Sequence, residues 1–168
     1  MNLIFSDENE KLTSEICDLM QRAADAALDM EFGEDLKAEG LKSGDAKAEI
    51  SVSIVSSEEI CEINREFRGI GSATDVLSFP QYDNHDSLLG DLLTEPEGAY
   101  VPIGDVVICY DKALSQAEEY ETGVKRELLY LFVHSIMHLF GYDHMNEEDK
   151  KEMREHEEKV LAEIGVSR

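Results

Sequence analysis

Three histidines interrupt one apolar segment, ELLYLFVHSIMHLFGYDHMNEED. Its apolar residues recur with helical spacing and predict a buried helix over residues 124–140. His134 and His138 are four residues apart, so both rings project from one face of this helix, about one turn apart. Gly141 then permits a left-handed turn, after which His144 can approach the pair. The segment therefore brings three imidazoles together at the end of a long central helix.

Three convergent imidazoles are a typical set of metal ligands. Three neutral nitrogen ligands suit zinc, and nickel or copper are chemically reasonable competitors. Structural zinc sites normally have four protein ligands, mostly cysteine, whereas catalytic sites leave the fourth position to water or substrate. We therefore predict one divalent ion, Zn²⁺ or another such as nickel, bound by His134, His138 and His144 in a catalytic centre.

A zinc peptidase is the first alternative, because two histidines four residues apart also mark the zinc-binding helix of those enzymes. In peptidases a glutamate follows the first histidine and serves as general base. Ser135 occupies that position here and cannot take up a proton at neutral pH, so peptide hydrolysis is disfavoured. The other two histidines, His85 and His156, have charged neighbours, and we expect both to be ordinary solvated residues.

The rest of the chain alternates between strand-like and helix-like periodicity. Strands are predicted over residues 3–5, 48–56, 75–80 and 103–110. Further helices are predicted over residues 10–30, 56–69, 112–121 and 147–164. This order predicts an α+β fold, with a small mixed β-sheet of about four strands layered with four to five helices. The strand order does not follow from the sequence.

We expect a single domain over residues 1–168, because a chain of this length can bury a sufficient core by itself. Two polar segments interrupt the pattern. Residues 31–47 predict a variable loop, and residues 81–100 predict an acidic loop. The three cysteines are widely spaced in apolar surroundings, which favours reduced, buried thiols.

The chain carries 38 acidic residues against 15 basic ones, a net charge of −23. Such a charge keeps a protein soluble and repels polyanions at long range, so taken alone it argues against a nucleic acid partner. Neither an export signal nor an apolar segment of membrane-spanning length is evident. We therefore expect a cytoplasmic protein without a membrane partner.

The segment HSIMHLFGYDH closely resembles the zinc signature of the YbeY family of bacterial endoribonucleases, which usually reads H-G-x-L-H-L-x-G-Y-D-H. Two further segments, INREFRGIGSATDVLSFP and IGDVVIC, are similar to motifs of the same family. Met153 and Glu157 fit its closing helix, so the resemblance covers about residues 48–160. Ser135 and Met137 depart from the usual glycine and leucine, but these changes remove no ligand.

The resemblance implies a zinc-dependent, single-strand-specific endoribonuclease that acts in rRNA maturation, notably at the 3′ end of 16S rRNA, and in ribosome quality control. It implies ribosomal RNA and ribosomal particles as partners, and no DNA. Arg68 falls on the arginine of the family's N-x-x-[YF]-R motif, and a guanidinium can bind a phosphate through two parallel hydrogen bonds. Asp143 directly precedes the third histidine and could accept a hydrogen bond from a ligand ring. Arg68 and Asp143 are therefore candidate catalytic residues.

Both candidates also have a structural interpretation. Arg68 could pair with one of many nearby carboxylates, and Asp143 could stabilise the turn. Two other functions stay open: a non-catalytic ribosome-assembly factor with a structural zinc, and a metallohydrolase of small phosphoesters. A protein that melts after loss of a ligand histidine would favour the first, and turnover of nucleotides without cleavage of oligomers would favour the second.

Overall fold

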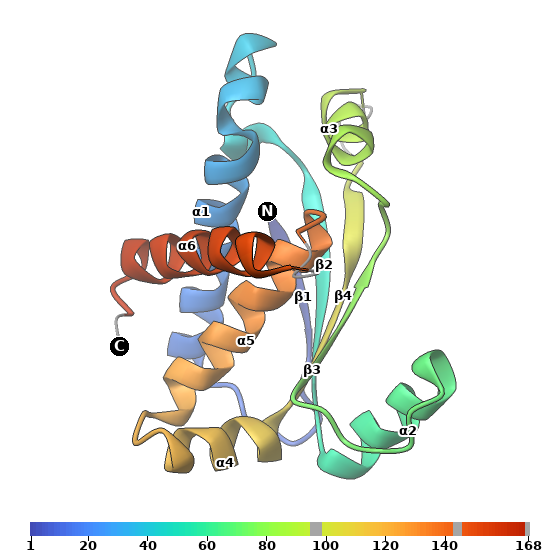
Figure 1. Ribbon diagram of the computed structural model, residues 1–168. Helices are drawn as coiled ribbons and strands as arrows, with labels where there is room; N and C mark the ends of the chain where they lie inside the picture. The colour runs from blue at the N-terminus through green and yellow to red at the C-terminus, as the bar shows by residue number, and fades with distance from the viewer. Residues whose placement is uncertain (95–98, 143–145, 167–168) are drawn as a thin grey trace.

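The computed structural model describes residues 1–94, 99–142 and 146–166, which form a small sheet flanked by helices (Figure 1). The strands are β1 (Asn2–Ser6), β2 (Ala48–Val55), β3 (Val76–Pro80) and β4 (Val101–Cys109). The helices are α1 (Ser14–Ala38), α2 (Ser57–Arg68), α3 (His85–Thr94), α4 (Tyr110–Glu119), α5 (Val124–Leu139) and α6 (Glu147–Glu163), with a 3₁₀ turn over Ser43–Asp45. None of the described helices has both the length and the apolar character needed to cross a membrane.

The four strands form one mixed sheet in the order β1-β2-β4-β3. β2 pairs in parallel with both β1 and β4, and β3 runs antiparallel to β4 at one edge. Along β2 the residues alternate between buried and half-buried, as expected for a strand that covers the main core with one face. The predicted α+β class and the mixed four-stranded sheet are confirmed.

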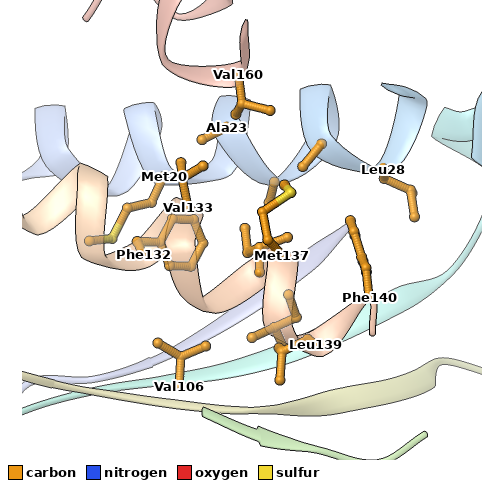
Figure 2. Close-up of a cluster of buried hydrophobic side chains, with 14 of the residues drawn as sticks. Met20, Ala23, Leu28, Val106, Phe132, Val133, Met137, Leu139, Phe140 and Val160 are labelled. Atoms are coloured by element: carbon orange, nitrogen blue, oxygen red, sulfur yellow. The ribbon is translucent and has the colours of Figure 1, made fainter. Parts of the chain in front are cut away.

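Helix α5 lies at the centre of the molecule. Figure 1 shows α1, α4, α5 and α6 on one side of the sheet, and α5 packs against α1, α4, α6, β3 and β4. In Figure 2 Val133 and Met137 of α5 lie beside Met20 and Ala23 of α1, and all four side chains are buried in the main core. Because several elements pack against α5, its backbone is held in place. The two histidines on its remaining face therefore project from a fixed position.

The predicted loop over residues 31–47 is wrong for its first half, because α1 continues to Ala38. Leu28, Phe32 and Leu36 recur every four residues and are buried, which extends the apolar face of α1. The polar residues between them obscure this spacing in the sequence. Only the second half of the segment consists of turns and the short 3₁₀ turn.

The acidic segment 81–100 contains helix α3 where the sequence predicts a loop, so the described residues form one α-helix more than the predicted maximum of five. Leu88 and Leu92 of α3 are buried. The ring of His85, expected to be solvated, stacks on Phe32 with a centroid separation of 4.3 Å. Helix α3 is therefore stabilised by contacts with α1 and β4 that local periodicity does not reveal.

Candidate metal centre

Helix α5 brings His134 and His138 together as their spacing predicts. Both residues are half-buried, the ring planes are perpendicular, and the ring centroids lie 4.7 Å apart. The two Nε2 atoms are 3.2 Å apart. Two nitrogens on a tetrahedral zinc, each about 2.0–2.1 Å from the ion, are separated by about 3.3 Å. The pair therefore has the spacing of two ligands of one ion.

The other nitrogen of each ring has an oxygen partner. His134 Nδ1 lies 2.7 Å from Oε1 of Glu157 on α6, and His138 Nδ1 lies 2.9 Å from the carbonyl oxygen of Tyr142. A carboxylate and a carbonyl only accept hydrogen bonds, so both Nδ1 atoms must be the donors. With its Nδ1 as the donor, each ring in its neutral form has its lone pair on Nε2, and this tautomer can ligate a metal.

Gly141 ends α5 in the way that the sequence predicts. Its φ is +97°, a conformation that glycine adopts without a side-chain clash. The Gly141 amide donates to the His138 carbonyl, and the Tyr142 amide donates to the Met137 carbonyl, which together form a Schellman motif. This turn directs the chain back toward α5, so that the Tyr142 carbonyl reaches the His138 ring.

Asp143 and His144 lie outside the described residues, so the third ligand and the candidate beside it stay predictions. Across residues 1–94, 99–142 and 146–166, no cluster of three or more histidine, cysteine or carboxylate side chains is arranged to hold an ion. The described pair accounts for two of the three predicted ligands. The third predicted ligand, His144, follows Tyr142 by two residues in the sequence.

A hydrogen-bonded network holds Tyr142 from two other helices. Its hydroxyl donates to Oε2 of Glu31 on α1 over 2.8 Å, and Nδ1 of His156 on α6 lies 2.7 Å from Oε1 of the same carboxylate. The side chains of Glu31 and His156 are 7% and 21% exposed, so the prediction of a solvated His156 is wrong. Burial and the Glu31 carboxylate raise the pKa of Tyr142, which keeps its hydroxyl protonated as a donor.

Exchange of Glu157 for glutamine should weaken metal binding and leave the protein folded. The amide oxygen can still accept from His134 Nδ1, but the lost charge makes the ring a poorer ligand, and loss of such a partner costs about 10–100-fold in metal affinity. Competition with a chelating dye measures the zinc affinity. Glu163→Gln removes the same charge from an exposed position of α6 and is the control. Equal zinc affinities of the two variants would contradict this role of Glu157.

A cleft of about 560 Å³ adjoins the histidine pair, and Arg68 lines it together with both rings. The Arg68 guanidinium makes one long contact, 3.5 Å from Nη2 to the Ser78 carbonyl oxygen. Among the described carboxylates, none lies within ion-pair distance of Arg68. The structure thus brings Arg68 into the same cleft as the histidines, and the salt-bridge interpretation finds no described partner.

Asp75 lines the same cleft and is held as a carboxylate. Gln116 donates to Oδ2 over 3.0 Å, and the Thr74 hydroxyl and Val76 amide donate to Oδ1 over 3.1 and 2.9 Å. Burial would raise the pKa of Asp75, but these hydrogen bonds outweigh it and hold the pKa below its usual value. Asp75 therefore stays ionised at neutral pH and anchors the start of β3.

Ser135, which replaces the usual glycine of the family, is buried in α5 and does not line the cleft. Its hydroxyl has no hydrogen-bond partner among the described residues. A buried unsatisfied hydroxyl costs about 1–3 kcal/mol, and alanine is also the better helix former. Ser135→Ala should therefore raise the free energy of unfolding in urea by about 1 kcal/mol, and Ser135→Gly should be about 1 kcal/mol less stable than Ser135→Ala. A less stable alanine variant would show that the hydroxyl has a partner.

The mixed four-stranded sheet and the central helix place the chain in the α+β class, and one solved structure has a similar fold. The chain aligns with the solution structure of TM1509 from Thermotoga maritima at a TM-score of 0.62 and 26% sequence identity. The alignment covers 96% of this chain and 88% of that protein. The two proteins therefore share the arrangement of sheet and helices over nearly the whole chain.

The chain belongs to the endoribonuclease YbeY family, whose sequence model matches residues 4–165. A protein named endoribonuclease YbeY from Caldanaerobacter subterraneus subsp. tengcongensis is 48% identical over 122 residues, which are 73% of this chain and 77% of that protein. Another from Oceanobacillus iheyensis is 39% identical over 170 residues and spans all of both chains. The family assignment made from the sequence motifs is confirmed.

Proposed function

We propose that the chain is a zinc-dependent, single-strand-specific endoribonuclease that acts in rRNA maturation, at the 3′ end of 16S rRNA, and in ribosome quality control. Its substrates are ribosomal RNA and ribosomal particles in the cytoplasm. One observation carries the proposal: the two Nε2 atoms lie 3.2 Å apart while both Nδ1 atoms donate to oxygens. Membership in an endoribonuclease family supports the reaction class.

In this proposal His134, His138 and His144 hold the ion, and zinc bound there supplies Lewis-acid polarisation of a phosphoryl oxygen. Glu157 and the Tyr142 carbonyl keep the two described rings in the ligating tautomer. From its place in the cleft, Arg68 donates two hydrogen bonds to the phosphate. These bonds orient the phosphodiester and offset the negative charge that develops in the transition state.

The net charge of −23 opposes RNA binding at long range. Arg68 and a bound dication act at short range, where salt screens their attraction less. The proposal therefore implies weak, salt-sensitive binding of free RNA and stronger binding of a strand that a ribosomal particle presents.

Two measurements on one preparation test the proposal. Elemental analysis should find about one zinc per chain, and the protein should cleave single-stranded RNA but spare the matched duplex. A chelator should abolish cleavage, and added zinc should restore it. The product ends identify the nucleophile, because attack by the 2′-hydroxyl leaves a cyclic phosphate. Cleavage by metal-free protein, or turnover of small phosphoesters without cleavage of oligomers, would overturn the proposal.

A further inference from the structure

An endonuclease must hold nucleotides on both sides of the bond that it cleaves, because the strand continues in both directions. The cleft with Arg68 can hold one side. His134 also lines a second cavity, of about 470 Å³, between α5 and α6. The two cavities share His134 and no other described residue, so they leave the histidine pair in different directions. The second cavity has the size of a small-ligand site and can accept a nucleotide unit.

The wall of this second cavity is rich in positive charge for so acidic a chain. Lys150, Lys151 and Arg154 line it from α6, together with Glu147 and Glu157. Glu157 is 3% exposed and already accepts from a histidine ring, and Glu147 pairs with Lys150 at the exposed rim over 2.7 Å. With 38 acidic residues against 15 basic ones in the chain, three cations around one cavity are a local reversal of the charge balance.

Arg154 and Tyr130 face this cavity as a cation beside an aromatic ring. Arg154 is exposed, and no carboxylate within the described ranges lies at ion-pair distance from it. Tyr130 is half-buried, and its ring is within 23° of parallel to the His134 ring at a centroid separation of 6.1 Å. Such a pair matches single-stranded nucleic acid, which offers phosphates to cations and bases to aromatic faces.

We propose that the second cavity is a nucleotide subsite for single-stranded RNA, in which Arg154 binds a backbone phosphate and Tyr130 stacks on a base. The inference rests on the proposed ribonuclease function and adds the path of the strand: Arg68 holds the phosphate on one side of His134, and Arg154 holds one on the other. A third cavity, of about 730 Å³, shares Tyr130 and Arg154 with the second and is also lined by the exposed Tyr120. Asp75 of the Arg68 cleft also lines this third cavity, so it adjoins both of the other cavities.

Steady-state cleavage of single-stranded oligonucleotides tests the subsite. Arg154→Ala should raise KM about tenfold, change kcat by less than about threefold, and lower the slope of log KM against log salt by about 1, because one phosphate contact is lost. Lys159→Ala removes the same charge from α6 at a different cavity and should change none of these. Tyr130→Leu should raise KM about tenfold, whereas Tyr130→Phe keeps the ring and should raise KM less than Tyr130→Leu does.

Failure of the subsite and failure of the proposed function give different results. If the wild-type protein cleaves no RNA, the proposed function fails and the subsite fails with it. If the wild type cleaves RNA but Arg154→Ala matches Lys159→Ala, the subsite alone is wrong. Equal KM values for Tyr130→Leu and Tyr130→Phe would also refute it. A fall in kcat with an unchanged salt slope would assign Arg154 a structural role and overturn the inference.

Discussion

Exchange of His138 for alanine should abolish zinc binding and slow RNA cleavage by at least about 10³-fold, while the chain stays folded. The variant keeps too few nitrogen ligands to hold zinc tightly. In the proposed function the lost ion would supply several kcal/mol of transition-state stabilisation as a Lewis acid, and each 1.4 kcal/mol is about tenfold in rate. The fold should survive because α5 is held by its buried face, which includes Phe132, Val133 and Met137.

Zinc content, a thermal melting curve and the cleavage rate of single-stranded RNA, all from one preparation of His138→Ala, test this expectation. His85→Ala is the matched control, because it removes an imidazole that stacks on Phe32 and should keep zinc and activity. A His138→Ala protein that melts would favour the ribosome-assembly factor with a structural zinc. A folded variant with its full zinc content would refute the ligand role of His138.

Gly104→Ala should lower the free energy of unfolding by more than about 3 kcal/mol. A Cβ atom there would clash with the carbonyl oxygen of Phe79 and lie 2.8 Å from Cδ2 of Leu139. The clashing oxygen belongs to the backbone of β3, which lies beside Gly104 because Gly104 pairs with Pro80. The φ of Gly104 is +157°, a conformation that residues with a side chain rarely adopt. Relief requires β3 or the end of α5 to move, and His138 lies at that end. Cleavage should therefore fall together with stability.

Urea unfolding of the Gly104→Ala and Gly90→Ala variants measures the free energy of unfolding of each. Gly90→Ala is the control, and its expected change in stability has the opposite sign. A Cβ atom at Gly90, inside α3, would meet nothing within 4 Å, so alanine should stabilise that position by about 0.5–1 kcal/mol. The expected loss for Gly104→Ala corresponds to a melting temperature about 6–12 °C lower. Wild-type stability in Gly104→Ala would mean that the β3–β4 pairing accommodates a side chain.

Sequence reasoning was sufficient where a structure depends on residues within a few positions of one another. Helix α2 lies within the predicted range 56–69: Ser56 and Glu59 form a capping box at its start, and Gly69 ends it in a left-handed conformation. His134 and His138 share one face because they are four residues apart in a helix. Hydrogen bonds and side-chain directions of this kind are determined within one or two turns, so they can be predicted without knowledge of the fold.

Sequence reasoning failed where the stabilising contacts come from distant parts of the chain. The C-terminal part of α1 and all of α3 were predicted as loops because the first segment is polar with glycines and the second is acidic with glycine and proline. Phe32 and His85 stabilise these two helices through a contact with each other. Neither segment has a local pattern that predicts this stacking, because each ring has the other, from a distant part of the chain, as its packing partner.

Only the tertiary structure decided which residues support the candidate centre. The strand order β1-β2-β4-β3 is a property of the whole sheet, and it was not predictable from the strands taken singly. Glu31 holds Tyr142 from 111 residues away, and Arg68 reaches the histidine cleft from α2. The sequence by itself determined the histidine pair, the glycine turn and the family, because each depends on short spacings. The hydrogen-bonded network around the histidine pair depends on contacts between residues far apart in the sequence. These contacts form only when the whole chain has folded.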